Sequence, residues 1–143
     1  MNVARMLKDK GRNVVTVKPE TPLSDIISLL AKHKIGGIVV CDDDLYVKGI
    51  ITERDFIRIL AEKGTGALSQ AVKFHMTKDV HTCTIHDNVE WLMEVMTQHR
   101  FRHLPVVENN RLMGIISIGD VVKQRLALAE LETSSMRQYI ATG

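Results

Sequence analysis

Apolar residues recur at helical spacing in two stretches of the chain, and both stretches share one pattern. The first stripe and its counterpart 66 positions later are Leu23, Ile26, Ile27 and Leu30, and then Val89, Leu92, Met93 and Met96. A spacing of three and four residues places such side chains on one face of a helix. We therefore expect two equivalent helices, which end near His33 and His99.

Short β-branched and apolar runs predict strands around these helices. Ile38–Cys41 predicts a buried strand, and Asp42–Asp44 a hairpin turn before the return strand. Thr21, followed by Pro22, is the expected N-cap of the first of the two helices, and Asp87 with Glu90 is expected at the start of the second. Further predicted elements are a helix over Val3–Lys8, strands over Val14–Val17 and Val80–Ile85, a linking helix over Ala67–Met76 and a final helix from Val121 toward Tyr139.

The most distinctive pattern is a turn that occurs twice. Gly49-Ile50-Ile51-Thr52-Glu53-Arg54-Asp55 is repeated as Gly114-Ile115-Ile116-Ser117-Ile118-Gly119-Asp120. Each copy predicts a strand that ends at the hydroxyl residue and passes into a helix with the aspartate in its first turn. A hydroxyl residue three positions before an acid is also a helix capping box, so each copy alone has a purely structural explanation. Two copies in one short chain indicate a duplicated unit.

The duplicated unit is strand–helix–strand–strand–helix. The offset falls from 66 to 65 residues after the hairpin, because the second turn, at Asn109-Asn110, is one residue tighter. We expect an α/β (α+β) fold of two βαββα units, related by a pseudo-two-fold axis, that bury each other's sheet faces and leave paired clefts. The predicted division is residues 1–64 for the first unit with the N-terminal helix, 65–78 for the linking helix, 79–126 for the second unit and 127–143 for a helical tail.

Composition and charge narrow the class of protein. The 143 residues are 45% apolar, and 19 basic and 17 acidic residues give a formal net charge of +2. This balance argues against a nucleic-acid surface, which needs a basic stripe. The N-terminus lacks the apolar core of a secretory signal, and no apolar run approaches the width of a bilayer. Two cysteines make no disulfide framework, which fits a reducing cytoplasm, so we expect a cytoplasmic protein. From the charge balance and the lack of a long apolar run we expect no nucleic-acid or membrane partner.

At the repeated turns the chain resembles a tandem pair of cystathionine-β-synthase-type (CBS) domains, also called a Bateman module. The resemblance covers roughly residues 10 to 126 and rests on both turns and on His103-Leu104-Pro105-Val106-Val107. The first unit departs from the family pattern. Val39 stands where the second unit has Pro105, and Gly36-Gly37 where it has Arg102-His103, so the two clefts should differ.

The resemblance implies a non-enzymatic, energy-sensing module that binds an adenine nucleotide in its clefts. AMP is the first expectation, and ADP, ATP, NAD(H) and S-adenosylmethionine are further candidates. Such modules usually regulate an attached enzyme or channel and tend to form disc-like homodimers. Because this sequence contains no catalytic domain, we expect a stand-alone module of the bacterial type that acts on an unidentified protein by a ligand-linked change in conformation or in the dimer.

An adenosine ligand requires an acceptor for the ribose diol, donors for the phosphate and an apolar slot for the base. The residues expected to supply these groups are Thr16, Gly37, Ile38, Val39, Thr52, Arg54 and Asp55 in the first cleft, and Thr82, Arg102, His103, Leu104, Pro105, Ser117 and Asp120 in the second. The first cleft ranks higher for the set of threonine, arginine and aspartate, because Gly119 replaces Arg54 in the second. A phosphate in the second cleft would then depend on Arg102 or His103.

Simpler explanations stand beside these roles. Asp55 and Asp120 can serve only as helix caps, Arg54 as a solvated surface residue and His103 as a core residue. The motif His81-x-Cys83-x-x-His86 lacks a fourth ligand, and His86 would point away from the other two in a strand, so we expect no metal site.

Two other classes of function remain open. The tail over Leu126–Gly143 suggests a structural protein-interaction module with vestigial clefts. An enzyme is disfavoured, because the sequence has no Ser-His-Asp order, no nucleophile with a nearby base and no metal set.

Overall fold

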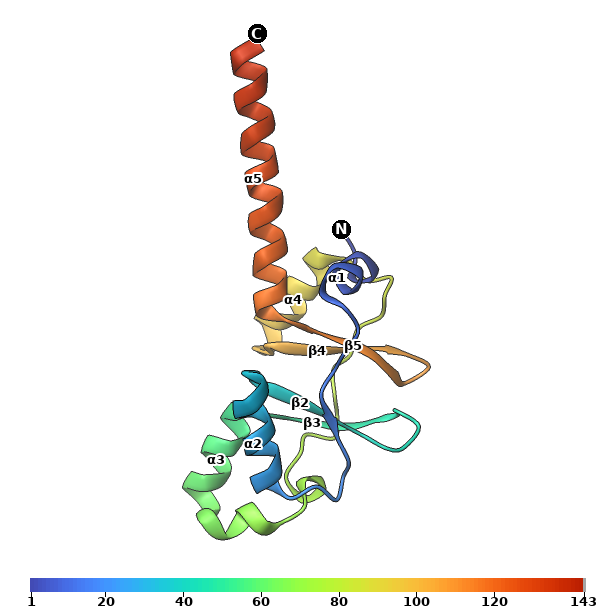
Figure 1. The fold of residues 1–143 in the computed structure, drawn as a ribbon, viewed down its shortest axis with the longest axis vertical. Coiled ribbons are helices and arrows are strands. Elements are labelled where there is room, and N and C mark those ends of the chain that lie inside the picture. The colour runs from blue at the N-terminus through green and yellow to red at the C-terminus, as the bar shows by residue number, and fades with distance from the viewer. Residues whose placement is uncertain (143) are drawn as a thin grey trace.

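Two α/β units lie one above the other in this computed structural model, which describes residues 1–142, and a long helix projects from one end (Figure 1). The first unit comprises β1 (Thr16–Val17), α2 (Leu23–His33), β2 (Gly37–Cys41), β3 (Val47–Thr52) and α3 (Glu53–Lys63). The second unit comprises α4 (Val89–His99), β4 (His103–Glu108), β5 (Arg111–Ser117) and α5 (Ile118–Thr142), and α1 (Val3–Lys10) precedes both units. The predicted mixture of helix and strand in two related units is confirmed.

The two sheets have equivalent registers. β1 pairs in parallel with β2, β2 pairs antiparallel with β3, and β4 pairs antiparallel with β5. Gly37 lies opposite Thr52 in the first unit, and His103 lies opposite Ser117 in the second. The register also shifts after Val40 and after the equivalent Val106. The repeat seen in the sequence is therefore a repeat of backbone geometry.

The second unit lacks the regular strand predicted over Val80–Ile85. Only Cys83 forms a bridge, parallel to Val106, with Cys83 N donating to Pro105 O and Val107 N donating to Cys83 O, 2.9 Å each. A parallel ladder would continue through the N–H of residue 105 toward residue 81, and proline has no N–H to donate. The first unit has Val39 at this position, and there a two-residue strand forms.

The linking helix predicted over Ala67–Met76 is also wrong. Two 3₁₀ helices, η1 (Thr65–Ser69) and η2 (Val72–Phe74), occupy this segment. Between them the backbone is extended and tied to the start of α2, because Leu23 N donates to Gln70 O at 3.0 Å and Val72 N donates to Thr21 O at 2.8 Å. These bonds to another part of the chain exclude a continuous helix.

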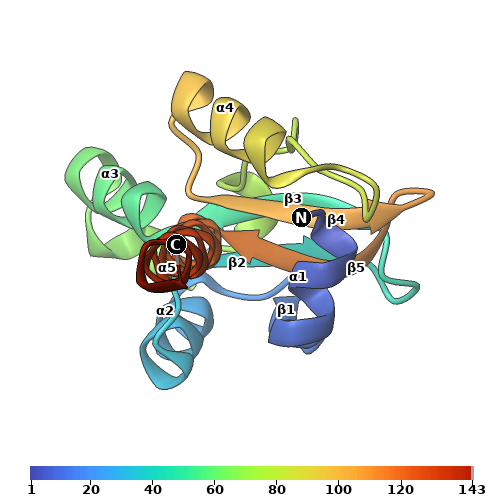
Figure 2. The same ribbon diagram turned by 90° about the horizontal axis from the view of Figure 1, so that it is seen from above.

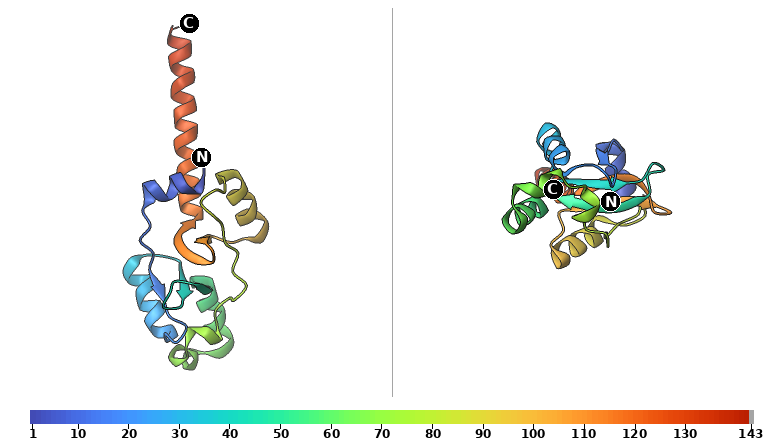
Figure 3. Two further views of the ribbon diagram at one scale, coloured as in Figure 1. Left: turned by 90° about the vertical axis from the view of Figure 1, so that its right-hand side faces the viewer. Right: turned by 90° about the horizontal axis from the view of Figure 1, so that it is seen from below.

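Each unit is completed by a segment that comes from outside its own repeat. Val3, Met6 and Leu7 of α1 pack into the core of the second unit, although α1 directly precedes the first unit in the sequence. Ala67 and Val72, which follow the first unit, pack into the first core. Figure 3 shows α1 beside the upper unit, and the chain crossing from there to the lower one. The division of the chain at residues 64, 78 and 126 itself stays a prediction.

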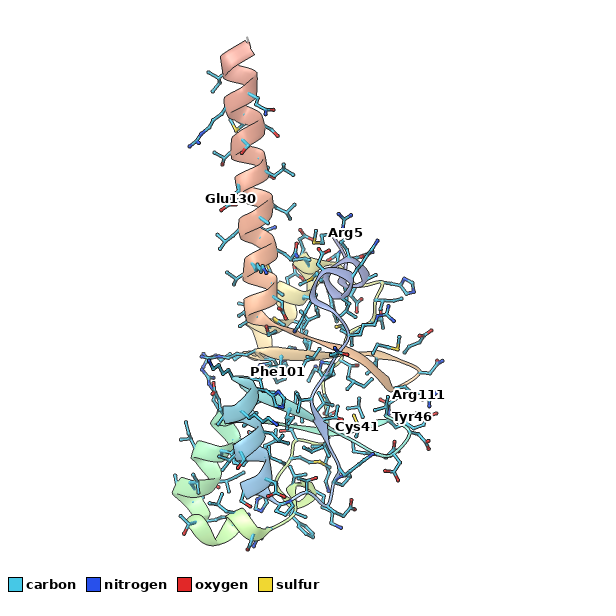
Figure 4. All side chains as sticks on the ribbon, viewed as in Figure 1. Arg5, Cys41, Tyr46, Phe101, Arg111 and Glu130 are labelled. Atoms are coloured by element: carbon cyan, nitrogen blue, oxygen red, sulfur yellow. The ribbon has the colours of Figure 1, made fainter. Side chains whose placement is uncertain are left out.

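The facing sides of the two sheets form a third apolar cluster, and the hairpin tips are joined. Val39, Cys41, Val47 and Leu112 are its buried members. At the tips, Leu112 N donates to Leu45 O at 2.9 Å, and the Arg111 guanidinium lies over the Tyr46 ring, 5.5 Å from its centroid. Figure 4 shows Arg111 and Tyr46 together at this edge of the molecule.

Several local predictions need correction. The N-cap of α2 is Pro22, and the Thr21 hydroxyl instead accepts from Lys18 N at 3.2 Å. The N-cap of α4 is Asn88, whose side chain accepts from Trp91 N at 2.8 Å. Met93 is 37% exposed, so of the two methionines in the second stripe only Met96 is a core residue. Within residues 1–142, no helix has the length and apolar character needed to cross a bilayer.

Candidate functional site

A cleft lies at the junction of the two units, where α3 begins and β4 begins. Figure 4 shows Phe101 at this junction, between the strands of the second unit and the helices of the first. The lining comes from both units and from the segment that connects them: Gly36, Ile50, Thr52, Glu53, Arg54, Asp55, Thr77, Asp79, Val80, His81, Arg100, Phe101, Arg102 and His103. We call this the first cleft.

The acid of the first cleft is held by the repeated turn. Asp55 Oδ2 accepts from Thr52 N at 2.8 Å and from the Thr52 hydroxyl at 3.2 Å, so the predicted capping box is present. Asp55 Oδ1 accepts from Arg58 Nη2 at 3.3 Å. The side chain is 20% exposed. These bonds fix the carboxylate at the start of α3, with one oxygen bonded in the helix cap and the other directed to the exposed Arg58.

Backbone contacts hold the connecting segment against the turn. Ile50 N donates to Thr77 O at 3.0 Å, and Thr77 N donates to Ile50 O at 2.9 Å. This close approach requires glycine at position 49, because a Cβ there would collide with Met76 Sδ and lie 2.9 Å from Thr77 O. Glu53 N donates to Gly36 O at 2.9 Å and thus ties the start of α3 to the residue before β2. The wall of the cleft is therefore set by main-chain bonds.

Three arginines face the cleft from two units. Arg54 lies in the first turn of α3, while Arg100 and Arg102 lie between α4 and β4. Arg100 ends α4 in the left-handed conformation, with φ 59°. All three side chains are exposed. Guanidinium groups bind phosphate oxygens through paired, charge-assisted hydrogen bonds, so this cluster suits an anionic group at the mouth of the cleft.

An aromatic cluster forms another part of the wall. The His81 ring centroid lies 4.7 Å from that of Phe101 and 4.9 Å from that of His99, and His99 and Phe101 are stacked at 5.5 Å. His81 and Phe101 line the cleft together with Ile50 and Val80. A flat, apolar base finds aromatic and aliphatic contacts on this wall.

His103 occupies the space between the two units. A Cβ on Gly37 would lie 3.1 Å from His103 Nδ1, so the glycine leaves room for the ring. Nδ1 is buried and has no hydrogen-bond partner among the described residues. Burial, followed by the charge of Lys10, lowers the pKa of His103 below its ordinary value, although Glu53 acts in the opposite direction. The ring is therefore held neutral, with an unpaired polar atom at the edge of the first cleft.

The second copy of the turn has a different environment. Asp120 Oδ2 accepts from Ser117 N at 2.8 Å, from the Ser117 hydroxyl at 2.9 Å and from Lys10 Nζ at 2.6 Å. Lys10 Nζ also donates to Ile115 O at 2.8 Å. Burial alone would raise the pKa of Asp120, but the bonds from Lys10 and Ser117 outweigh it and lower the pKa. Lys10 of α1 thus forms an ion pair with the acid of the second turn.

The structure groups the predicted site residues differently from the sequence. Thr52, Arg54 and Asp55 lie together as expected, but Arg102 and His103, assigned to the second cleft, line the first. The reason is the packing of the units, which sets the start of β4 against the start of α3. Several lining residues that carry chemistry were not indicated by any sequence pattern: Glu53, Asp79, His81, Arg100 and Phe101. The 66-residue offset marks equivalent positions, yet it does not show which unit faces which.

The predicted apolar slot does not form part of the first cleft. Ile38, Val39 and Leu104 are fully buried in the cores of the molecule, as Gly37 and Pro105 are in their strands. Thr16 pairs with Val39 in the sheet, and Thr82 precedes the Cys83 bridge. Ile50, Val80 and Phe101 provide the apolar wall instead. In residues 1–142, no group of three or more potential metal-binding side chains is found.

Two stacked, duplicated α/β units with a cleft at their junction define a paired-module fold. The family model for the CBS domain matches the chain twice, over residues 7–62 and 70–127, and the chain belongs to this family. The tandem arrangement agrees with the resemblance seen in the sequence.

Solved structures of similar proteins support this assignment. A CBS-domain protein from Agrobacterium tumefaciens is 50% identical, with a TM-score of 0.84 over 87% of this chain and 99% of that one. CBSX2, solved in complex with AMP, is 28% identical, with a TM-score of 0.74 over 83% of this chain and 92% of that one. Inosine-5′-monophosphate dehydrogenase of Methanocaldococcus jannaschii is 35% identical over 116 residues, which are 80% of this chain but 22% of the enzyme. The likeness to that enzyme thus concerns a minor part of its length.

Proposed function

We propose that the first cleft binds an adenine nucleotide and that the chain is a non-enzymatic regulatory module. The observation that carries the proposal is the pairing of a fixed carboxylate, Asp55, with the guanidinium groups of Arg54, Arg100 and Arg102 in one cleft. A nucleotide offers hydroxyl donors at its ribose and an anion at its phosphate, and the carboxylate and the guanidinium groups of this cleft are suited to these two groups. The complex of CBSX2 with AMP supports AMP as the first ligand to test.

The expected binding mode follows from the cleft. The ribose diol donates to Asp55, the phosphate accepts from the arginines and from Thr52, and the base lies against Phe101 and Val80. Repulsion between the Asp55 carboxylate and the phosphate keeps these two groups at opposite ends of the ligand.

Such a ligand would act by contacting both units at once. Asp55 and Thr52 belong to the first unit, whereas Arg100 and Arg102 belong to the second. A nucleotide that contacts both binds most tightly to one relative arrangement of the units and so shifts the population toward it. This shift is the proposed signal to a protein that the module regulates.

Cysteine chemistry gives no support to an enzymatic role. Burial raises the pKa of Cys41 to about 11 and that of Cys83 to about 12, so neither thiol is a thiolate nucleophile at neutral pH. Two buried cysteines that form no disulfide are consistent with the reducing cytoplasm, where we expect the protein to act.

The direct test is calorimetry with AMP on the wild type, Asp55→Ala and Asp120→Ala. Both variants lose the same type of helix cap, so Asp120→Ala controls for stability, and circular dichroism checks that each protein is folded. We expect Asp55→Ala to weaken AMP binding by at least about tenfold, and Asp120→Ala to change it little. Equal affinity in the wild type and Asp55→Ala would refute the assignment. Titrations with ATP, NADH and S-adenosylmethionine then rank the ligands.

A further inference from the structure

The outer part of α5 extends beyond the rest of the molecule (Figures 1 and 3). Its large apolar side chains are exposed. Leu126 is 60%, Met136 66% and Ile140 74% exposed. A helix without tertiary packing is marginally stable in water, because most helical stability in proteins comes from an apolar face that packs. Glu130 and Arg137, moreover, have no oppositely charged residue three or four positions away to support the helix. These features indicate a surface that is covered in the functional protein.

Most of the exposed apolar residues of this part of α5 follow the repeat of a coiled coil, and Leu131 lies outside it. Steps of four and three residues alternate through Val122, Leu126, Ala129, Thr133, Met136 and Ile140. This period of 3.5 residues forms a narrow seam, which we call the α5 seam, with Leu126, Thr133 and Ile140 at a positions and Val122, Ala129 and Met136 at d positions. The Thr133 hydroxyl donates to Ala129 O within the helix at 2.9 Å. Burial of the seam would therefore leave no unpaired hydroxyl.

We propose that the α5 seam packs against the α5 seam of a second copy of this chain, as a parallel two-stranded coiled coil. In a parallel pair, each g position faces the next e position of the other helix. Arg125 then faces Glu130 of the second copy, and Glu132 faces Arg137 of the second copy. Both contacts join opposite charges.

The antiparallel alternative fits the same seam poorly. With full overlap of the seam, Lys123 would face Arg137 of the second copy, and Glu130 and Glu132 would each face their own counterpart. All of these contacts join like charges, which is unfavourable. Flanking charges set partner and orientation in coiled coils, so the sequence of α5 specifies a second copy in parallel orientation.

The rest of the molecule leaves room for this arrangement. Figure 2 looks along α5 and shows the helix between α3 and the sheets, but the outer part of α5 projects beyond both units, as Figure 1 shows. Figure 4 shows Glu130, which flanks the seam, on the side of α5 turned away from α1. Arg125 Nη1 lies 3.5 Å from Glu90 Oε1 of its own chain, with both side chains at least half exposed, and such contacts contribute little. Arg125 can therefore exchange this partner for Glu130 of the second copy.

Sedimentation equilibrium on Leu126→Glu and Leu131→Glu tests the seam. Leu126 lies in the seam, whereas Leu131 is equally exposed, at 64%, but lies on the opposite face of α5. We expect the wild type and Leu131→Glu to be dimers. Leu126→Glu should raise the dimer dissociation constant at least about tenfold. A monomeric wild type, or a dimer that Leu126→Glu does not weaken, would overturn the proposal. The α5 seam would then be a binding surface for a different protein.

Disulfide trapping tests the orientation. In a parallel pair Met136 meets Met136 of the second copy, whereas in the antiparallel pair it meets Leu126. Met136→Cys should therefore form a covalent dimer under mild oxidation, and Leu131→Cys should not. The native Cys41 and Cys83 are buried and give little background. A wild-type dimer without a Met136→Cys cross-link would reject the parallel arrangement. Neither result depends on nucleotide binding.

Discussion

The two copies of the glycine-to-aspartate turn have the same local structure and different surroundings. Both contain a strand that ends at a hydroxyl residue and a carboxylate that caps the next helix. The first carboxylate, Asp55, shares its cleft with three arginines, and the second, Asp120, is bonded to Lys10. By the 66-residue offset Lys10 is the counterpart of Met76, an uncharged residue. The repeated turn thus fixes the position of an acid. The segment packed against the turn, which carries Met76 in the first copy and Lys10 in the second, determines what the acid can bind.

The largest expected effect concerns the glycines that begin the two turns. Gly49→Ala would place its Cβ 2.9 Å from the main-chain oxygen of Thr77, whereas Gly114→Ala would approach the end of the Leu7 side chain, 2.7 Å from Cδ2. Because a side-chain end adjusts more easily than backbone, we expect a loss of about 3 kcal/mol at position 49 and about 1 kcal/mol at position 114. Urea unfolding measures both. Gly66→Ala, with no neighbour within 4 Å, is the control. Equal losses at the two turns would contradict the difference in their surroundings.

The sequence predicted the paired units, because the repeated turn and the apolar stripes are local patterns with one common offset. It also predicted Thr52, Arg54 and Asp55 as neighbours, since one helical turn contains all three. The meeting of Arg100 and Arg102 with that turn depends on how the units pack, and no local pattern records this. The same holds for Lys10, whose partner Asp120 lies 110 residues away. The strand predicted over Val80–Ile85 does not form, because Pro105 of the adjacent strand has no N–H with which to continue the ladder.

Replacing an arginine of the first cleft should weaken the binding of AMP but not the binding of adenosine. Arg102→Ala should weaken AMP binding about tenfold, which corresponds to about 1.4 kcal/mol, because a charge-assisted hydrogen bond to the phosphate is lost. Adenosine, which has no phosphate, should bind the variant and the wild type alike. Calorimetry with both ligands measures this, and Arg5→Ala on the exposed side of α1 serves as the control. Equal losses for AMP and adenosine would show that Arg102 does not contact the phosphate.

Lys10→Met replaces Lys10 by the residue type of its counterpart, Met76, and removes the ion pair with Asp120. The lowered pKa of Asp120 means that this pair stabilises the folded state above the ordinary carboxylate pKa, and that the contribution is lost as pH falls through the folded pKa. We expect a loss of about 0.5–1 kcal/mol at neutral pH that disappears in acid. Unfolding followed across pH checks this. Lys18→Met, which breaks the exposed pair with Asp43, should have a smaller effect. A loss that persists in acid would exclude the ion pair as its cause.

The smallest expected effect is the pH response of His103. Its folded pKa lies below the unfolded value of about 6.5, so protons bind more readily to the unfolded chain and stability falls as pH drops below that value. Lys10, Glu53, Arg102 and Asp120 are the charged groups that act on the ring. His103→Gln should therefore reduce the loss of stability on mild acidification. An unchanged pH profile would show that the ring titrates normally.

The stoichiometry of AMP binding tests the difference between the two turns most directly. Calorimetric titration of the wild type with AMP should give one molecule per chain, because Lys10 is paired with Asp120, the acid of the second turn. Two equal sites per chain, or a single site that survives Asp55→Ala and is lost in Asp120→Ala, would contradict the assignment of the nucleotide to the cleft formed by Asp55, Arg54, Arg100 and Arg102.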